Sequence, residues 1–346
     1  MKISSHKNSA TIYYGALSII LILSCFCGLM LGYTSLSPKE LFFALINPLT
    51  SPDTVWSFNS QVVWELRLPR VILAACVGMG LTLSGVLMQS IFQNPMADPY
   101  IMGISSGAAL GATCAVFLGA GTYFGSEIIG VGAFIGSLIL TCIIVSASNK
   151  NKTDLTYLLI LGIAMAAVCS GITSVLVYIG SDSTGTDISL YWLVGNVSYA
   201  KLYSSLFLLL LVLLCNFYFL TQTRILNLMI EGHETALSLG VYLPTYIKKY
   251  LLINAILVGV IVMNVGLIGF VGLIIPHATR IIVGADHRQL LPLSILLGGI
   301  FTVWIDILGR ILFTGIDLPL GVTMAIIGTP VFILLLCRHS SQTERG

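Results

Sequence analysis

The chain has 346 residues, of which 57% are hydrophobic and only 9% are charged, and its net charge is +2. Soluble domains carry about a quarter charged residues. This composition excludes a water-soluble globule and predicts a multi-spanning membrane protein. The near-neutral charge also argues against a nucleic-acid partner.

Apolar windows long enough to cross a bilayer predict about ten helices. They run near residues 12–33, 70–92, 101–119, 127–147, 155–180, 202–220, 250–268, 289–313 and 320–337, with a shorter tenth near 268–283. The windows lack the polar–apolar alternation of membrane barrel strands, so helices are the structure they favour. We therefore expect an all-α membrane protein, with residues 1–346 forming a single polytopic transmembrane domain.

Lys and Arg predict the orientation, because cytoplasmic loops carry an excess of both. With the N-terminus inside and ten crossings, the cytoplasmic basic residues are Lys2, Lys7, Lys150, Lys152, Arg224, Lys248, Lys249, Arg280, Arg288, Arg338 and Arg345. The outward basic residues are Lys39, Arg67, Arg70, Lys201 and Arg310. Both termini are thus predicted to be cytoplasmic. The three outward arginines lie at helix ends, where the charge bias gives no reason for them.

Several connections predict structured loops. The segment Asn94–Pro99 holds two prolines and must turn sharply. Residues 181–187 form a polar outer loop, and residues 187–192 predict a short re-entrant helix. Residues 231–240 predict a short amphipathic helix stopped by glycine, which either lies on the membrane surface or inserts into a cytoplasmic partner. Four spans precede this inner segment and four follow it, which suggests an inverted repeat of helices 2–5 and 7–10.

No catalytic, cofactor-binding or metal site is predicted. The chain has neither a GxxxxGK[ST] phosphate loop nor an HExxH motif, and its eight cysteines show no metal-ligand spacing. Asp306 lies inside a predicted span, where a carboxylate costs about 2.5–3.5 kcal/mol and often marks a proton path. A proton-coupled secondary transporter is therefore one alternative. A structural ion pair with Arg310, four residues later on the same helix face, is the interpretation that we favour.

Residues 270–280 form a glycine-interrupted apolar run that closes with Pro276, His277 and Arg280. Membrane insertion alone does not require this polar cluster. His277 follows a proline at a predicted cytoplasmic helix end, and we interpret it as a structural hydrogen-bonding residue rather than a metal ligand.

Three blocks of motifs, in order between about residues 62 and 337, resemble the FecCD family of importer permeases for iron–siderophore, haem and vitamin B12. The first comprises Arg67-Leu-Pro-Arg70, Gly78, Ser84-Gly85, Gln89, Asn94–Pro99 and Gly103–Ala109. The second comprises Gly269–Arg280, Asp286-His287-Arg288 and Leu291-Pro292. The third comprises Asp306 to Arg310, Asp317–Gly321 and Gly328-Thr-Pro330. Asp317 replaces a commoner Glu, and Met96 a commoner Leu.

The resemblance implies a type II ABC importer permease in the bacterial cytoplasmic (inner) membrane. It implies a homodimer with the pathway along its axis, two cytoplasmic ATPase subunits that bind ATP-Mg, and one periplasmic or lipid-anchored binding protein. The chain itself would be no enzyme and would bind no cofactor. A ferric siderophore is the expected substrate, and haem, cobalamin and molybdate stay open.

The resemblance also assigns roles to residues of this chain. Those expected to dock the binding protein, by pairing with carboxylates on its two lobes, are Arg67, Arg70 and Arg310. Those expected to couple to the ATPase are Glu231, Gly232, His233, Glu234, Ala236, Leu239 and Gly240. Thr156 is expected near the cytoplasmic gate. The structural motif residues are Asn94, Pro95, Pro276, His277, Arg280 and Asp306, and residues 270–280 are expected to position the coupling face.

Overall fold

The computed structural model describes residues 3–50, 56–100, 102–120, 127–147, 155–179, 194–312 and 317–343, and all regular elements in these ranges are helical. They are α1 (Ile3–Met30), α2 (Pro38–Thr50), α3 (Phe58–Gln61), the π-helical η1 (Val62–Arg67), α4 (Leu68–Ile91), α5 (Ile104–Phe117), α7 (Glu127–Ala147), α8 (Leu155–Ile179), α10 (Leu202–Thr221), α11 (Thr223–Glu231), α12 (His233–Ser238), α13 (Leu243–Val265), α14 (Val271–Val283), α15 (His287–Ile311) and α16 (Leu320–Thr343). The all-α prediction is confirmed.

Each of the ten predicted spans falls on one of these helices. In the described residues, 7 helices are long and apolar enough to cross a membrane, and α5, α14 and the stretch Leu320–Leu335 of α16 are shorter apolar helices. The predicted outer loop at 181–187 and the re-entrant helix at 187–192 lie outside the described residues.

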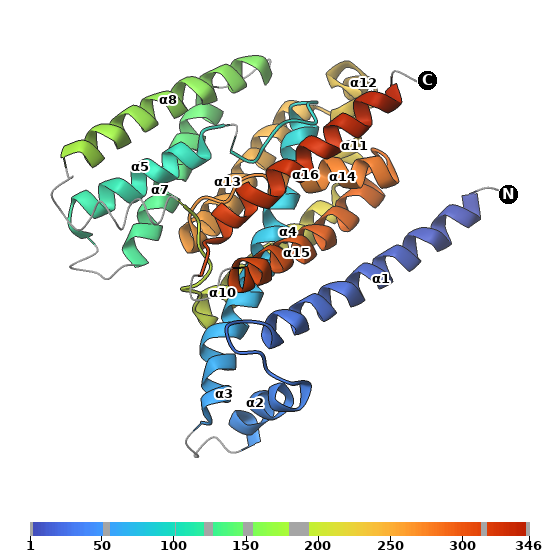
Figure 1. Cartoon of the computed structure of the whole chain (residues 1–346). Coiled ribbons are helices and arrows are strands. Elements are labelled where there is room, and N and C mark those ends of the chain that lie inside the picture. The colour runs from blue at the N-terminus through green and yellow to red at the C-terminus, as the bar shows by residue number, and fades with distance from the viewer. Residues whose placement is uncertain are drawn as a thin grey trace.

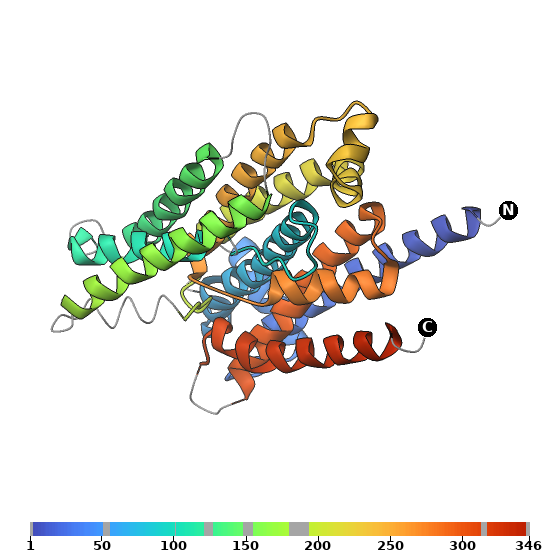
Figure 2. The ribbon, with the colours of Figure 1, turned by 90° about the horizontal axis from the view of Figure 1, so that it is seen from above.

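The helix α4 forms the centre of the bundle. It packs against α15, α10, α14 and α13, and nearly all of its side chains are buried. The group α5, α7 and α8 lies to one side of this centre (Figures 1 and 2). We call the end that holds Met30, α2 and α3 the α2 end, and the opposite end, where α11 and α12 lie, the α12 end. The helix α1 begins and the helix α16 ends at the α12 end (Figure 1).

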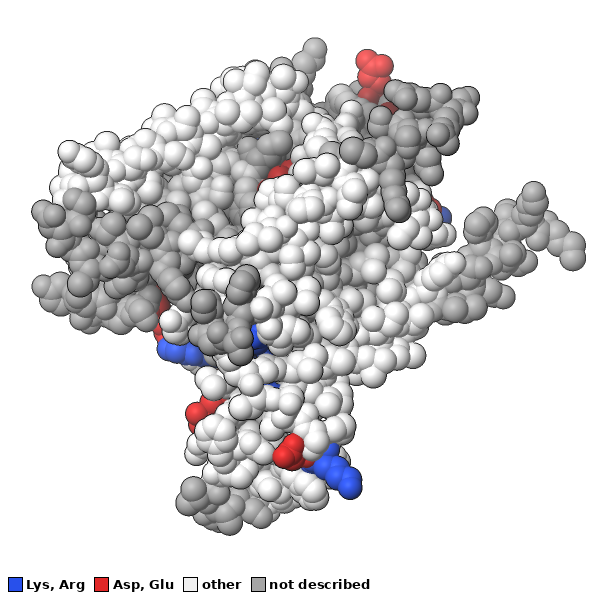
Figure 3. All heavy atoms as spheres, in the orientation of Figure 1, with Lys and Arg blue, Asp and Glu red and all other residues white. Residues whose placement is uncertain are grey.

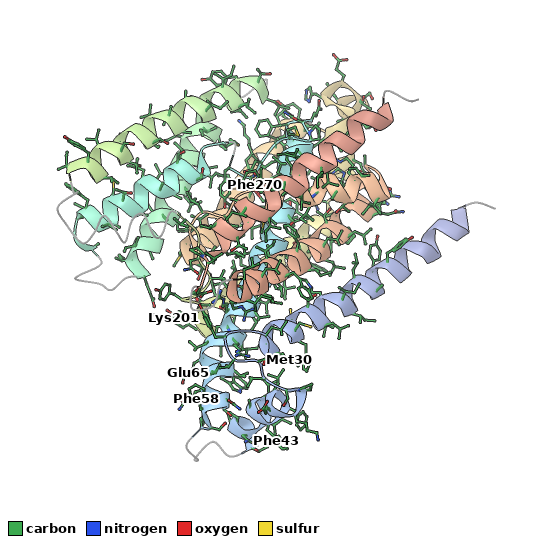
Figure 4. All side chains as sticks on the ribbon, viewed as in Figure 1. Met30, Phe43, Phe58, Glu65, Lys201 and Phe270 are labelled. Atoms are coloured by element: carbon green, nitrogen blue, oxygen red, sulfur yellow. The ribbon has the colours of Figure 1, made fainter. Side chains whose placement is uncertain are left out.

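The α2 end contains two elements that the sequence did not predict. The helix α2 and the α3–η1 segment project beyond α1 and α4 (Figure 1). Their inner faces share a small apolar core that includes Leu41, Ala44 and Val63. Their outer faces carry exposed aromatic rings, Phe43 and Phe58 among them (Figure 4). The helices α2 and α3 have 13 and 4 residues, which is shorter than a spanning window, so a search for such windows missed both elements.

The predicted amphipathic helix at residues 231–240 is wrong in its boundaries. Glu231 is the last residue of α11, and Gly232 with φ 101° separates it from α12, which covers only His233–Ser238. Gly240, with φ 77°, ends the segment, as a glycine stop predicts. A left-handed backbone at Gly232 makes the segment an elbow of two helices.

The short helices α5 and α14 have matching environments. Each begins after a residue with left-handed backbone, Gly103 with φ 73° and Phe270 with φ 70°. The helix α5 packs against α7 and α8, and α14 packs in the same way against α15 and α16. Phe270, labelled in Figure 4, adopts at some cost a conformation that glycine adopts freely. These correspondences agree with the inverted repeat, which stays a prediction.

Glycines bring α4 into backbone contact with its neighbours. A Cβ on Gly85 would lie 1.8 Å from the carbonyl oxygen of Gly272 in α14, and one on Gly78 would lie 2.2 Å from that of Gly298 in α15. Helices in lipid gain no hydrophobic driving force from associating, so such close backbone packing holds them together.

We expect Gly85→Ala to lower the melting temperature of the detergent-solubilised protein strongly. The added methyl group forces α4 and α14 apart, and overpacking costs about 1–3 kcal/mol or more. Gly15→Ala is the matched control, because no atom lies within 4 Å of its added Cβ. Alanine there gains about 1 kcal/mol of helix propensity. Equal melting shifts for the two variants would contradict the close-packing argument.

Candidate functional site

Two carboxylates and two guanidinium groups form a buried network at the α2 end. Asp306 Oδ1 lies 2.8 Å from both Nε and Nη2 of Arg70, and its Oδ2 lies 2.8 Å from Nη2 of Arg310. Arg70 also holds Asp317 through two bonds, Nη1 to Oδ2 at 2.6 Å and Nη2 to Oδ1 at 2.9 Å. Ser198 Oγ donates to Oδ2 of Asp317 at 2.6 Å. The network joins α4, α15 and the segments before α10 and α16.

The remaining donors of the arginines cap the C-terminal end of α1. Arg67 Nη1 donates to the carbonyl oxygens of Leu29 at 2.8 Å and Met30 at 2.9 Å, and Nη2 donates to that of Thr34. Arg310 Nη1 donates to the carbonyl oxygens of Gly28 at 3.0 Å and Leu31 at 3.2 Å. The last carbonyls of a helix lack intrahelical partners and carry partial negative charge. The arginines supply both the hydrogen bonds and the opposite charge.

The Asp317 carboxylate is the least buried member of this ion-pair network, with 27% of its side chain exposed. Burial acts to raise its pKa, but the hydrogen bonds from Arg70 and Ser198 and the nearby positive charges outweigh it. The pKa of Asp317 therefore lies below its ordinary value of 3.8.

The network bears on two predictions. The structural ion pair between Asp306 and Arg310 is confirmed, with guanidinium groups facing both carboxylate oxygens. Arg67, Arg70 and Arg310 are 5–8% exposed and bonded within the chain. Docking of a binding protein by these arginines stays a prediction. The structure gives them a role that the sequence did not reveal, which is to join α1, α4 and α15.

The elbow α11–α12 is the candidate coupling surface at the α12 end. Within it, Ala236 is fully buried, while Leu237 and Leu239 are 53% and 65% exposed. Glu231, His233, Glu234 and Gly240 are exposed as well, and Gly232 is half-buried. Gln93 Nε2, from the turn after α4, donates to the carbonyl oxygen of Met229 at 2.7 Å and ties α11 to α4. The contact with α4 therefore fixes the position of the elbow, whose exposed surface carries apolar and acidic side chains.

The stretch 270–280 packs against α4 through Gln89. Pro276 cannot donate to the carbonyl oxygen of Gly272, four residues earlier. Gln89 Nε2 lies 3.5 Å from that oxygen, and Gln89 Oε1 accepts from Arg280 Nη2 at 3.2 Å. His277 is buried, and its ring lies edge-on to the ring of Phe332 in α16, with 6.2 Å between the two ring centroids. These contacts agree with a positioning role for the stretch, which acts on α4 rather than directly on α12.

The other predicted residues lie apart from these two sites. Asn94 and Pro95 are in the turn after α4, where Asn94 Oδ1 accepts from the Met96 amide at 2.9 Å. Thr156 is exposed in the first turn of α8, and its gate role stays a prediction. In the described residues, no group of three or more His, Cys, Asp or Glu side chains could hold a metal ion.

Sequence reasoning missed several partners of these residues. Ser198, Gln93 and the carbonyl groups at the end of α1 have no motif that marks them. Asp317 stood out as a motif residue, but nothing in its position predicted two bonds to Arg70, 247 residues away.

Several known proteins that resemble this chain are described as transport proteins. A model of the FecCD transport family matches residues 20–338. The hemin transport system permease protein HmuU of Yersinia pestis is 37% identical over 334 residues, which cover 95% of this chain and 96% of that protein. The cobalamin import system permease protein BtuC of Halobacterium salinarum is 38% identical over 278 residues, which cover 80% of this chain and 73% of that protein. A solved structure described as an inward-facing conformation of a putative metal-chelate type ABC transporter has a TM-score of 0.81 and 30% identity, covering 94% of this chain and 99% of that one.

We expect Asp306→Asn to destabilise the protein severely. Removal of one partner from a buried ion pair costs about 3–5 kcal/mol, because it leaves charge without compensation. Glu127→Gln is the control: its carboxylate pairs with Lys201 where the two side chains are 57% and 56% exposed, and such pairs contribute little. Melting temperatures in detergent measure both effects. A shift for Glu127→Gln as large as that for Asp306→Asn would contradict the assignment.

The lowered pKa of Asp317 predicts how its contribution to the stability of the fold changes with pH. Its folded pKa lies below the ordinary 3.8, so its stabilisation is fully present above pH 3.8 and is lost as pH falls through the folded value. The difference in melting temperature between the wild type and Asp317→Asn should therefore be constant from pH 8 to about pH 5 and shrink below about pH 4. A difference that already shrinks between pH 7 and 5 would show that the pKa is raised instead.

Proposed function

The chain belongs to the FecCD transport family, and from this premise we propose that it forms the pathway for a metal chelate, in the first place a ferric siderophore. It is the permease subunit of a type II ABC importer and a multi-pass membrane protein. ATP hydrolysis belongs to a separate ATPase subunit, so the chain is not an enzyme, and a substrate-binding protein completes the system.

The substrate proposal rests on the similarity of nearly the whole chain to a hemin permease. The names of the cobalamin permease and of the metal-chelate transporter support the same chemistry, because hemin and cobalamin are both metals held in organic macrocycles. A ferric siderophore belongs to this class of chelated metals. Haem, cobalamin and molybdate are the alternatives for the same importer.

The α12 end is proposed to face the cytoplasm of a bacterium, with the permease in the inner membrane. Two observations support this orientation. Arg224, Lys248, Lys249 and Arg288 surround the α12 end, whereas three of the five basic residues assigned to the opposite side, Arg67, Arg70 and Arg310, are buried. The exposed leucines of α12 also suit a protein partner. An ATPase subunit that binds ATP-Mg would dock here.

A homodimer is the proposed assembly. The helix α8 has only 11% of its apolar window buried within the chain, and it forms the outer edge of the α5–α7–α8 group (Figure 1). Among the described residues on the face shown in Figure 3, charged groups are sparse, so lipid or a second permease would suit this described surface. The binding protein would dock at the α2 end, where Glu65 and Lys201 are exposed (Figure 4).

A pair of variants tests the proposed ATPase docking surface. Leu239→Asp places a charge directly after α12, on a side chain that is 65% exposed, and Leu66→Asp makes the same change at the α2 end, on one that is 59% exposed. We expect the first to reduce co-purification with the ATPase by about tenfold, as about 1.4 kcal/mol of lost contact does. The second should leave it unchanged. Equal retention of the ATPase by both variants would contradict docking at α12.

Uptake by a deletion strain tests the substrate. Cells lacking this chain should lose uptake of radiolabelled ferric siderophore and regain it with the wild-type gene. Hemin, cyanocobalamin and molybdate are measured in parallel, with an ATPase-inactive strain as the control. Loss of one of these three in place of the siderophore would replace the proposed substrate. Unchanged uptake of all four would contradict the importer proposal.

A further inference from the structure

His287 lies at the junction of three helices near the α12 end. It is fully buried at the start of α15. Its Nε2 lies 2.6 Å from Oγ of Ser90 in α4. Its Nδ1 and its backbone N–H lie 2.7 and 2.9 Å from Oδ1 of Asn227 in α11. Asn227 Nδ2 in turn donates to Oδ1 of Asp286 at 2.8 Å, and Asp286 caps α15.

The hydrogen-bond network fixes the orientation of these groups. The Asn227 oxygen must face the His287 backbone N–H, and its amide nitrogen must face the Asp286 carboxylate, because a flipped amide would oppose donor to donor and acceptor to acceptor. The Asn227 oxygen can only accept, so Nδ1 of His287 donates to it. Nε2 of His287 lies 2.6 Å from the Ser90 hydroxyl, whose one proton also lies within reach of the Val86 carbonyl oxygen at 2.7 Å. The roles of the Asn227 amide and of His287 Nδ1 are therefore fixed.

The helices α4 and α15 are tied together along their length. At the α2 end Arg70 of α4 pairs with Asp306 of α15. In the middle Thr302 Oγ1 of α15 donates to the carbonyl oxygen of Ala74 at 2.8 Å, beside the close contact of Gly78 with Gly298. At the α12 end the third tie is Ser90 with His287. The two helices therefore behave as one unit that crosses the membrane.

We propose that Asn227 is a positioning residue that latches the α11–α12 elbow to this α4–α15 unit, so that displacement of α12 by an ATPase moves both helices. The inference rests on the proposed function, in which α12 receives the ATPase. Asn227 is the group on α11 that reaches both the cap and the first residue of α15. The latch comprises Asn227, Asp286, His287 and Ser90.

A purely structural role makes a different prediction from a latch. If Asn227 only stabilised the fold, its loss would speed amide exchange equally with and without nucleotide. A latch predicts that the nucleotide-dependent difference itself becomes smaller in α15. The measurement is therefore hydrogen–deuterium exchange on the permease–ATPase complex in lipid nanodiscs, compared without nucleotide and with ATP plus orthovanadate.

In the wild type we expect the two states to differ in exchange at both residues 223–240 and residues 287–293. With Asn227→Asp, which sets two carboxylates against each other, the difference should persist at 223–240. At 287–293 it should be smaller by about twofold or more, within the range that one residue contributes to coupling. The double variant Asn227→Asp with Asp286→Asn again sets one amide against one carboxylate and removes the repulsion, so it should restore the difference.

Control variants separate the possible failures. Thr223→Ala, one turn earlier on α11, should behave as the wild type, and Asn227→Ala repeats the test without added charge. The latch is overturned if both Asn227 variants keep the wild-type difference at 287–293, or if the double variant folds without restoring it. A wild-type complex with no difference at 223–240 would instead overturn ATPase docking at α12, and with it the proposed function.

Discussion

The position of Asp306 between Arg70 and Arg310 is the constraint on which the rest of the α2 end depends. Two charges taken out of water cost several kcal/mol each, and only close partners of opposite charge offset this cost. Both carboxylate oxygens lie 2.8 Å from guanidinium nitrogens; the contact of Oδ1 with Arg70 includes a hydrogen bond, and that of Oδ2 with Arg310 Nη2 is an ion pair without hydrogen-bond geometry. Because Arg70 belongs to α4 and the other two to α15, this requirement fixes the two helices relative to each other at that end.

The surplus of positive charge explains how α1 and the segment before α16 join this arrangement. Three arginines face two aspartates, so one positive charge has no carboxylate. The end of α1 supplies unpaired carbonyl oxygens and the negative end of a helix dipole, and Arg67 and Arg310 bond to them. Asp317 supplies the second carboxylate from an otherwise irregular segment. Electrostatic balance, rather than apolar contact alone, therefore determines which elements meet here.

The sequence predicted what depends on average properties of long segments, and missed what depends on single contacts. All ten spans follow from hydropathy, because lipid requires long apolar helices. The elements α2 and α3 are too short to span a bilayer, so the same criterion did not find them. The break at Gly232 required knowledge of its φ angle. The arginines stood out against the charge bias, but their partners are backbone carbonyls and an aspartate 247 residues away, which no local pattern encodes.

The ties between α4 and α15 differ in strength from one end to the other. The α2 end is held by buried ion pairs, which cost about 3–5 kcal/mol to break, and the α12 end by neutral hydrogen bonds, each with a net contribution of about 1 kcal/mol. Along α15, the ties at His287 and Asp306 lie about 28 Å apart, at 1.5 Å per residue. A force applied at the α12 end therefore meets the weaker ties first, and the ion pairs at the α2 end hold the two helices together.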